Sequence, residues 1–192
     1  MTGLPHLGAA LPRRGSPVAR AFGRAVLRAM RWSVQAEVPD LPRFVIAVGP
    51  HTSNWDFIVG AATMFALDLR LSFLGKHTLF RWPFGALFRW MGGIPVDRSS
   101  PHGVVAQSVA AFAQEPRRIL AIAPQGTRRA GATIRSGFLH IARGANVPVV
   151  LATIDYATRS VRLGPAFAPG EDVDADVERV RRHFAAVRGK RG

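Results

Sequence analysis

A histidine and an aspartate five residues apart are the first side chains in this sequence whose types and spacing could do chemistry. His51 and Asp56 stand in the segment HTSNWD, which follows the apolar run Phe44–Val48. An aspartate beside an imidazole fixes the tautomer of the ring, and the ring can then take a proton from an attacking hydroxyl group. The pair is therefore a candidate general base.

Local structure decides whether the two side chains meet. On one continuous helix, residues five apart lie about 140° apart around the axis and miss each other. We therefore predict that His51 lies in a loop and Asp56 in the first turn of a helix from about Asn54 to Leu69. The alternative is structural: Ser53 would cap this helix, Asp56 would complete a capping box, and His51 would be only a loop residue.

Three later segments add to this pair: Gly93–Arg98 (GIPVDR), Pro124–Arg128 (PQGTR) and Val147–Ala152 (VPVVLA). In this order, the four segments resemble the four sequence blocks of the glycerolipid acyltransferase family, whose best-known members are the 1-acylglycerol-3-phosphate acyltransferases. A lone histidine–aspartate pair is weak evidence, whereas four blocks in register over about residues 44–155 are specific.

The resemblance implies an enzyme that moves a fatty acyl group from acyl-CoA or acyl-ACP to a hydroxyl group of a lysophospholipid such as 1-acylglycerol-3-phosphate. His51 would be the base, and Asp56 would orient it. A thiolate leaves easily, so one base and a stabiliser of the oxyanion suffice for this transfer. We therefore expect no cofactor and no metal ion. The thioester is a co-substrate, and acyl carrier protein is a candidate partner.

The second and third blocks imply the residues that bind the acceptor phosphate. Arg98 and Arg128 occupy the family's positions for guanidinium donors, which suit the geometry of phosphate. Gly126 and Thr127 can offer backbone N–H groups and a hydroxyl group to the same anion. The substrate-binding residues implied by the resemblance are therefore Arg98, Gly126, Thr127 and Arg128.

Two residues of the third block depart from the family pattern. Gln125 stands where the family usually has Glu, and Arg129 stands where it usually has Ser. Together these changes make the acceptor site two charges more positive. The departures leave the acceptor open: the alternatives to lysophosphatidate are a more anionic acceptor, a different lysolipid, or a loss of activity.

The chain of 192 residues is strongly basic, with 26 Lys and Arg against 12 Asp and Glu and a net charge of +14. Its partners should therefore be anionic. Charge alone leaves nucleic acid, anionic lipid head groups and phosphorylated small molecules open. No signature of a nucleic-acid-binding module is present, and with the acyltransferase resemblance we expect an anionic membrane surface and no nucleic acid as partner. Zero cysteines exclude a disulfide scaffold and a cysteine nucleophile. The rival to an enzyme is a non-catalytic basic protein that binds membranes or nucleic acid, with its arginines in a stripe away from His51.

The spacing of apolar and basic residues near the N-terminus predicts an amphipathic helix. Residues 1–16 are rich in Gly, Pro and Arg, which is typical of a mobile tail. Over residues 17–36, apolar side chains recur every four residues and arginines project from a separate arc. The apolar set is Val18, Phe22, Val26, Met30 and Val34, and the basic set is Arg20, Arg24, Arg28 and Arg31. Such a helix either lies in a membrane interface or packs on the domain with its arginines in solvent.

Membrane contact would have to be peripheral. The charge-free stretch Phe57–Leu67 has only 11 residues, whereas a membrane-spanning helix needs roughly 20. We therefore expect a peripheral protein on the cytoplasmic face of the membrane. The aromatic run Phe80–Trp90 either lines an acyl-chain groove, embeds in lipid, or belongs to the core.

Alternating strand and helix patterns over residues 37–192 predict one α/β domain. The sheet should be largely parallel or mixed and flanked by helices, as in the glycerolipid acyltransferases. Strands are expected at 44–48, 70–74, 94–96, 119–123, 147–154 and 160–163. Helices are expected at 54–69, 103–114, 137–143 and 173–187.

Overall fold

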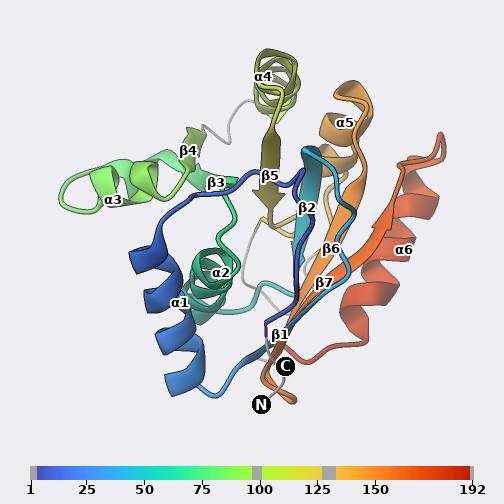
Figure 1. Ribbon diagram of the computed structural model, residues 1–192. Coiled ribbons are helices and arrows are strands. Elements are labelled where there is room, and N and C mark those ends of the chain that lie inside the picture. Colours follow the sequence, from blue (N-terminus) through green and yellow to red (C-terminus); the bar gives the residue numbers. More distant parts are fainter. Residues whose placement is uncertain (1–3, 97–100, 127–132, 191–192) are drawn as a thin grey trace.

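The computed structural model describes residues 4–96, 101–126 and 133–190, and its centre is a seven-stranded sheet (Figure 1). The strand order is β1-β7-β6-β2-β5-β3-β4. Neighbouring strands are parallel, except that β6 and β7 are antiparallel. The strands are β1 (Ser33–Ala36), β2 (Arg43–Gly49), β3 (Ser72–Lys76), β4 (Gly93–Val96), β5 (Arg118–Ile122), β6 (Val149–Asp155) and β7 (Ser160–Phe167). The predicted α/β domain with a largely parallel sheet is confirmed.

Helices cover both faces of this sheet, with α1 and α2 on one side and α4, α5 and α6 on the other (Figure 1). The helical elements are α1 (Pro17–Ala29), α2 (Trp55–Ala66), the 3-10 helix η1 (His77–Phe80), α3 (Gly85–Trp90), α4 (Pro101–Gln114), α5 (Gly137–Gly144) and α6 (Val173–Ala185). Successive strand residues point to opposite faces. In β2, Phe44 and Ile46 therefore join the core beneath α1 and α2, while Val45 and Ala47 join the other core.

The predicted helix over residues 17–36 is too long. Helix α1 ends at Ala29, and Arg31 has a positive φ of 58°. Residues 33–36 instead form strand β1 at the edge of the sheet, paired in parallel with β7. Val34 fits the four-residue period of the helix by its apolarity, but an apolar valine is equally suited to a buried position in a strand. The partner strand lies more than a hundred residues later in the chain and leaves no local signal.

The face of α1 that contacts the domain includes only part of the predicted apolar row. Ala19, Gly23 and Leu27 are buried against α2. At Gly23, an added Cβ would lie 2.5 Å from the backbone nitrogen of Ala66, so only glycine permits this close helix packing. Val18, from the predicted apolar row, is 80% exposed. Val26 and Met30, from the same row, are partly buried against the core, so only the start of the row is exposed.

The prediction of a mobile tail over residues 1–16 is wrong for its described part, residues 4–16. Leu7 and Leu11 are buried in the core beneath α1 and α2. The guanidinium group of Arg13 donates hydrogen bonds to the carbonyl oxygens of Leu7 and Leu67, at 2.8 and 3.0 Å. This segment is therefore an integral part of the domain. The other predicted strands and helices are present, with ends displaced by a few residues.

Candidate active site

The sheet brings three loops together at one edge. Strands β2, β5 and β6 are parallel neighbours, so their carboxyl ends meet there, which is where ligands bind in open α/β sheets. The register pairs Ala47 with Ile122 and Gly49 with Thr153. Continued by a few residues, this register places His51 between the loop after β5 and the loop after β6.

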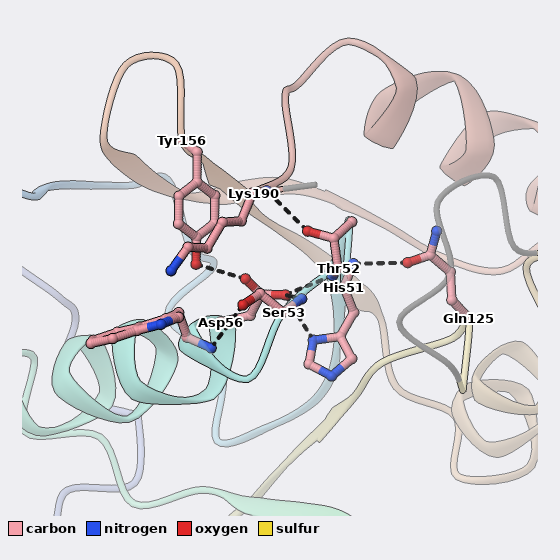
Figure 2. A network of polar contacts seen from close by, with 8 residues as sticks. His51, Thr52, Ser53, Asp56, Gln125, Tyr156 and Lys190 are labelled. Carbon is pink, nitrogen blue, oxygen red and sulfur yellow. Dashed lines mark hydrogen bonds and ion pairs between the residues drawn. The ribbon is translucent and has the colours of Figure 1, made fainter. Parts of the chain in front are cut away.

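The histidine and aspartate do meet (Figure 2). His51 Nδ1 lies 3.2 Å from Asp56 Oδ2. His51 precedes α2 in a loop, and Asp56 lies in the first turn of that helix, as the spacing predicted. The side chain of Asp56 is 1% exposed, whereas that of His51 is 22% exposed. The carboxylate is therefore buried, and the imidazole is partly exposed to solvent.

Asp56 also holds the loop that carries His51. Its Oδ2 atom accepts hydrogen bonds from the backbone N–H groups of Thr52 and Ser53, both at 2.7 Å. Ser53 Oγ also accepts from the N–H of Trp55 at 3.2 Å, so Ser53 and Asp56 exchange hydrogen bonds as in the predicted capping box, although the N-cap residue of α2 is Asn54, whose side chain makes no capping hydrogen bond. The capping role and the histidine-orienting role are therefore compatible, and one carboxylate performs both.

Sequence reasoning missed Tyr156. Its hydroxyl group donates a hydrogen bond to Asp56 Oδ1 at 2.7 Å (Figure 2). Tyr156 directly follows β6, and the pairing of Gly49 with Thr153, continued by three residues, places it opposite Thr52. Only the pairing of β2 with β6 would have indicated that Tyr156 belongs to the site, and the sequence around Tyr156 gives no sign of that pairing.

These donors set the ionisation of Asp56. Burial opposes the charged form and would raise the pKa of the carboxyl group. Hydrogen bonds from His51, from the backbone of Ser53 and Thr52 and from the Tyr156 hydroxyl outweigh burial and hold the pKa of Asp56 below its usual value. Asp56 is therefore a carboxylate at neutral pH and can stabilise a protonated His51.

The loop after β5 contacts the other side of His51. Gln125 is buried, and its Oε1 atom accepts a hydrogen bond from the backbone N–H of His51 at 2.8 Å (Figure 2). Gly126 has a φ of +62°, which favours glycine, and its own N–H donates to the carbonyl oxygen of Ala123 at 3.1 Å. This N–H thus closes a turn after β5, and the role of Gly126 in anion binding stays a prediction.

The other predicted binding residues have no described position. Arg98, Thr127 and Arg128 lie outside the described residues, and so does Arg129. Arg98 follows β4, whose carboxyl end lies at the same edge of the sheet as the ends of β2 and β5. Pro148 of the fourth block lies before β6, at the opposite edge, where its carbonyl oxygen accepts from Val45 N.

An apolar cavity of about 200 Å³ opens beside the pair, between α2 and the sheet. His51 and Asp56 are among its few polar lining residues, and Gly60 of α2 leaves a gap in which an added Cβ would meet no atom within 4 Å. The apolar lining includes Ile46, Val48, Phe57, Met64, Phe73, Met91, Ile154 and Leu163. Such a space fits a hydrocarbon chain.

A second hollow, of about 460 Å³, lies between α4 and α5 and is bordered by Pro124, Gly126 and Arg135. Within the described residues, no group of three or more His, Asp or Glu side chains is arranged to hold a metal ion.

The fold and the site together define a class of protein, in which a buried carboxylate orients a histidine at the carboxyl edge of a parallel sheet and beside an apolar cavity. The sequence matches the model of the family described as Acyltransferase over residues 33–155, more than half of the chain. The chain therefore belongs to this acyltransferase family, and its resemblance to the glycerolipid acyltransferases is confirmed.

No curated protein matches the chain in sequence. Among solved structures, the chain is similar to the 1-acyl-sn-glycerophosphate acyltransferase PlsC from Thermotoga maritima, with a TM-score of 0.58 and 16% sequence identity. The similarity covers 90% of this chain and 80% of that one. It shows that the two proteins share a fold.

Proposed function

We propose that the protein transfers a fatty acyl group from acyl-CoA or acyl-ACP to a hydroxyl group of a lysophospholipid such as 1-acylglycerol-3-phosphate. The observation that carries the proposal is the His51–Asp56 pair at the apolar cavity, which joins a base to a space for a hydrocarbon chain. Membership of the acyltransferase family supports the reaction type. The Thermotoga maritima protein of similar fold is a 1-acyl-sn-glycerophosphate acyltransferase, which supports the choice of acceptor.

The proposed mechanism starts at the exposed side of the imidazole. With Nδ1 facing Asp56, the proton on Nδ1 is favoured, so Nε2 accepts the proton of the acceptor hydroxyl group. The hydroxyl oxygen then bonds to the carbonyl carbon of the thioester. When the tetrahedral intermediate collapses, the carbon–sulfur bond breaks and the leaving thiolate takes the proton from His51. Asp56 stabilises the imidazolium between these two proton transfers.

The cavity supplies the proposed site for the acyl chain. Its apolar lining removes hydrocarbon surface from water. The acceptor phosphate is assigned to Arg98, Gly126, Thr127 and Arg128, the residues that the resemblance implies for it. The alternative acceptor is another hydroxyl-bearing lipid, which would use the same base and the same cavity.

We also propose a peripheral location on the cytoplasmic face of the membrane. Trp82 is 93% exposed, and further large apolar side chains of the same surface segment are exposed with it, namely Phe84, Leu87 and Trp90. From Leu69 to Val96 the sequence contains four basic residues and no Asp or Glu. An exposed aromatic segment without acidic residues suits an anionic lipid surface. In the part of the chain that the structure describes, no helix is both long and apolar enough to cross a bilayer.

The rival is a non-catalytic basic protein that binds membranes, and His51→Ala separates the two. The variant should bind vesicles like the wild type but lose at least about 100-fold in acyl transfer, the contribution of general-base catalysis. Thioester consumption, with mass spectrometry of the lipids formed from a panel of lysolipids and acyl donors, measures the loss. His6→Ala, which removes an exposed histidine far from Asp56 in sequence, is the control. Turnover near wild type in His51→Ala would exclude the proposed mechanism.

A further inference from the structure

We propose that Tyr156 is a positioning residue for acyl transfer, which holds the Asp56 carboxylate in the orientation that His51 requires. The inference rests on the proposed function, because it assigns Tyr156 a role in the chemistry of His51. Tyr156 belongs to none of the four sequence blocks, and it is the one tyrosine of the chain.

The division of donors between the two carboxylate oxygens is the first argument. Oδ2 faces His51 and accepts from the backbone N–H groups of Thr52 and Ser53, while Oδ1 accepts from the Tyr156 hydroxyl group at 2.7 Å. A carboxylate held at both oxygens cannot rotate about its terminal bond without breaking a hydrogen bond. The tyrosine therefore opposes the rotation that would turn Oδ2 away from the imidazole.

Tyr156 is itself held from three sides, which is the second argument. It follows directly from β6, and its backbone N–H donates to the carbonyl oxygen of Arg188 at 2.9 Å. Its ring contacts Trp32 edge-on, with the ring centroids 5.0 Å apart. The same C-terminal segment holds the catalytic loop, since the backbone N–H of Lys190 donates to Thr52 Oγ1 at 3.0 Å (Figure 2). A hydroxyl group so fixed can impose an orientation on its partner.

The hydroxyl group remains a donor throughout the working pH range, which is the third argument. Burial, the hydrogen bond to Asp56 and the negative charge of that carboxylate all raise the pKa of Tyr156. The phenol therefore stays neutral. Its hydrogen bond to the carboxylate weakens the attraction between Asp56 and a protonated His51. Tyr156 thus affects both where the carboxylate points and how strongly it holds the imidazolium.

Tyr156→Phe tests the inference, because it removes only the oxygen and keeps the ring against Trp32. We expect kcat roughly tenfold or more lower, as for the loss of a hydrogen bond to a charged group, with KM for the acyl thioester within about twofold. The acid limb of the kcat/KM profile should move to higher pH by about half a unit, because a carboxylate with one donor fewer attracts the imidazolium more strongly. Thr158→Val, which removes a hydroxyl group bonded to Asp155 in the same β6–β7 connection, should leave the profile unchanged.

Biosynthetic replacement of tyrosine by 3-fluorotyrosine gives a second test, in which the expected shift has the opposite sign. It alters position 156 alone, because the chain contains one tyrosine. A fluorinated phenol is a stronger hydrogen-bond donor, so the acid limb should move to lower pH, and the ring still packs. Both readouts are normalised to the folded fraction. An unchanged profile in both proteins, or a loss of kcat that only follows unfolding, would overturn the role of Tyr156. Those results would leave the proposed function intact, because that depends on His51→Ala.

Discussion

Gln125 shows how one side chain connects two blocks of the motif. Its amide oxygen accepts the backbone N–H of His51, and the side chain is buried. A glutamate carboxylate could accept the same hydrogen bond, so the departure from the family pattern changes charge rather than geometry. The charge would lie next to the base and at the start of the segment that leads to Arg128.

We therefore predict that Gln125→Glu keeps the fold and changes acceptor preference. A charge near an acceptor phosphate is worth a few kcal/mol at an effective dielectric constant of about 20, before screening by salt. The measurement is kcat/KM of both proteins over acceptors with and without a phosphomonoester. The wild type should have only modest activity on lysophosphatidate. Identical acceptor rankings would show that position 125 does not sense acceptor charge.

Helix α2 has two separate roles, and each depends on specific positions. Its first turn places Asp56 at the site, and further along Ala62 and Ala66 pack against Gly23 of α1. Gly60, by contrast, lines the cavity and has free space in front of it. Glycine inside a helix costs about 0.5–1 kcal/mol relative to alanine. Its presence at this position preserves the volume of the cavity.

Gly60→Phe should therefore shorten the acyl chain that the enzyme accepts. We expect kcat/KM to fall at least about tenfold for long-chain thioesters and to change little for short ones, because the phenyl ring occupies the space of the distal carbons. Gly60→Ala is the matched control, and it should stabilise the fold by about 0.5–1 kcal/mol with little effect on chain length. The same chain-length ranking in Gly60→Phe would place the acyl chain elsewhere.

At the scale of the whole molecule, most of the exposed large apolar side chains belong to α1 and to the segment from Leu79 to Trp90. Val18 and Phe22 of α1 are exposed, and Figure 1 shows α1 and α3 on the same side of the sheet. Arg14 links the two regions, because it lies three residues before the start of α1 and its guanidinium group lies over the Trp90 ring, 4.6 Å from the centroid. A membrane on this side would meet α1 and the aromatic segment together.

Two variants separate the charged from the apolar part of this surface. Changing Arg20, Arg24, Arg28 and Arg31 to Gln should release the protein from anionic vesicles in low salt, since each arginine near such a surface contributes about 1 kcal/mol. Trp82→Ala with Phe84→Ala should weaken binding to anionic and neutral vesicles alike, because the loss is apolar. Co-sedimentation measures both. Binding equal to wild type in both variants would contradict this orientation.

Contacts within a short segment could be predicted from the sequence. The His51–Asp56 pair lies within six residues, so the position of a helix start suffices to bring the side chains together. The alternation of apolar runs and helical patterns likewise predicts the α/β fold, because each pattern reflects burial of its own segment.

The order of the strands depended on the tertiary structure, and the rest of the site followed from it. Tyr156 reaches Asp56 across 100 residues of sequence, and Gln125 reaches His51 across 74. Both contacts exist because β6 and β5 flank β2. Strand β1 is a further example. Its residues fit a helical period in the sequence, but in the structure they form a strand because they hydrogen-bond to β7. Several distant segments of similar apolarity could pair in parallel, and the packing of the complete chain determines which of them become neighbours.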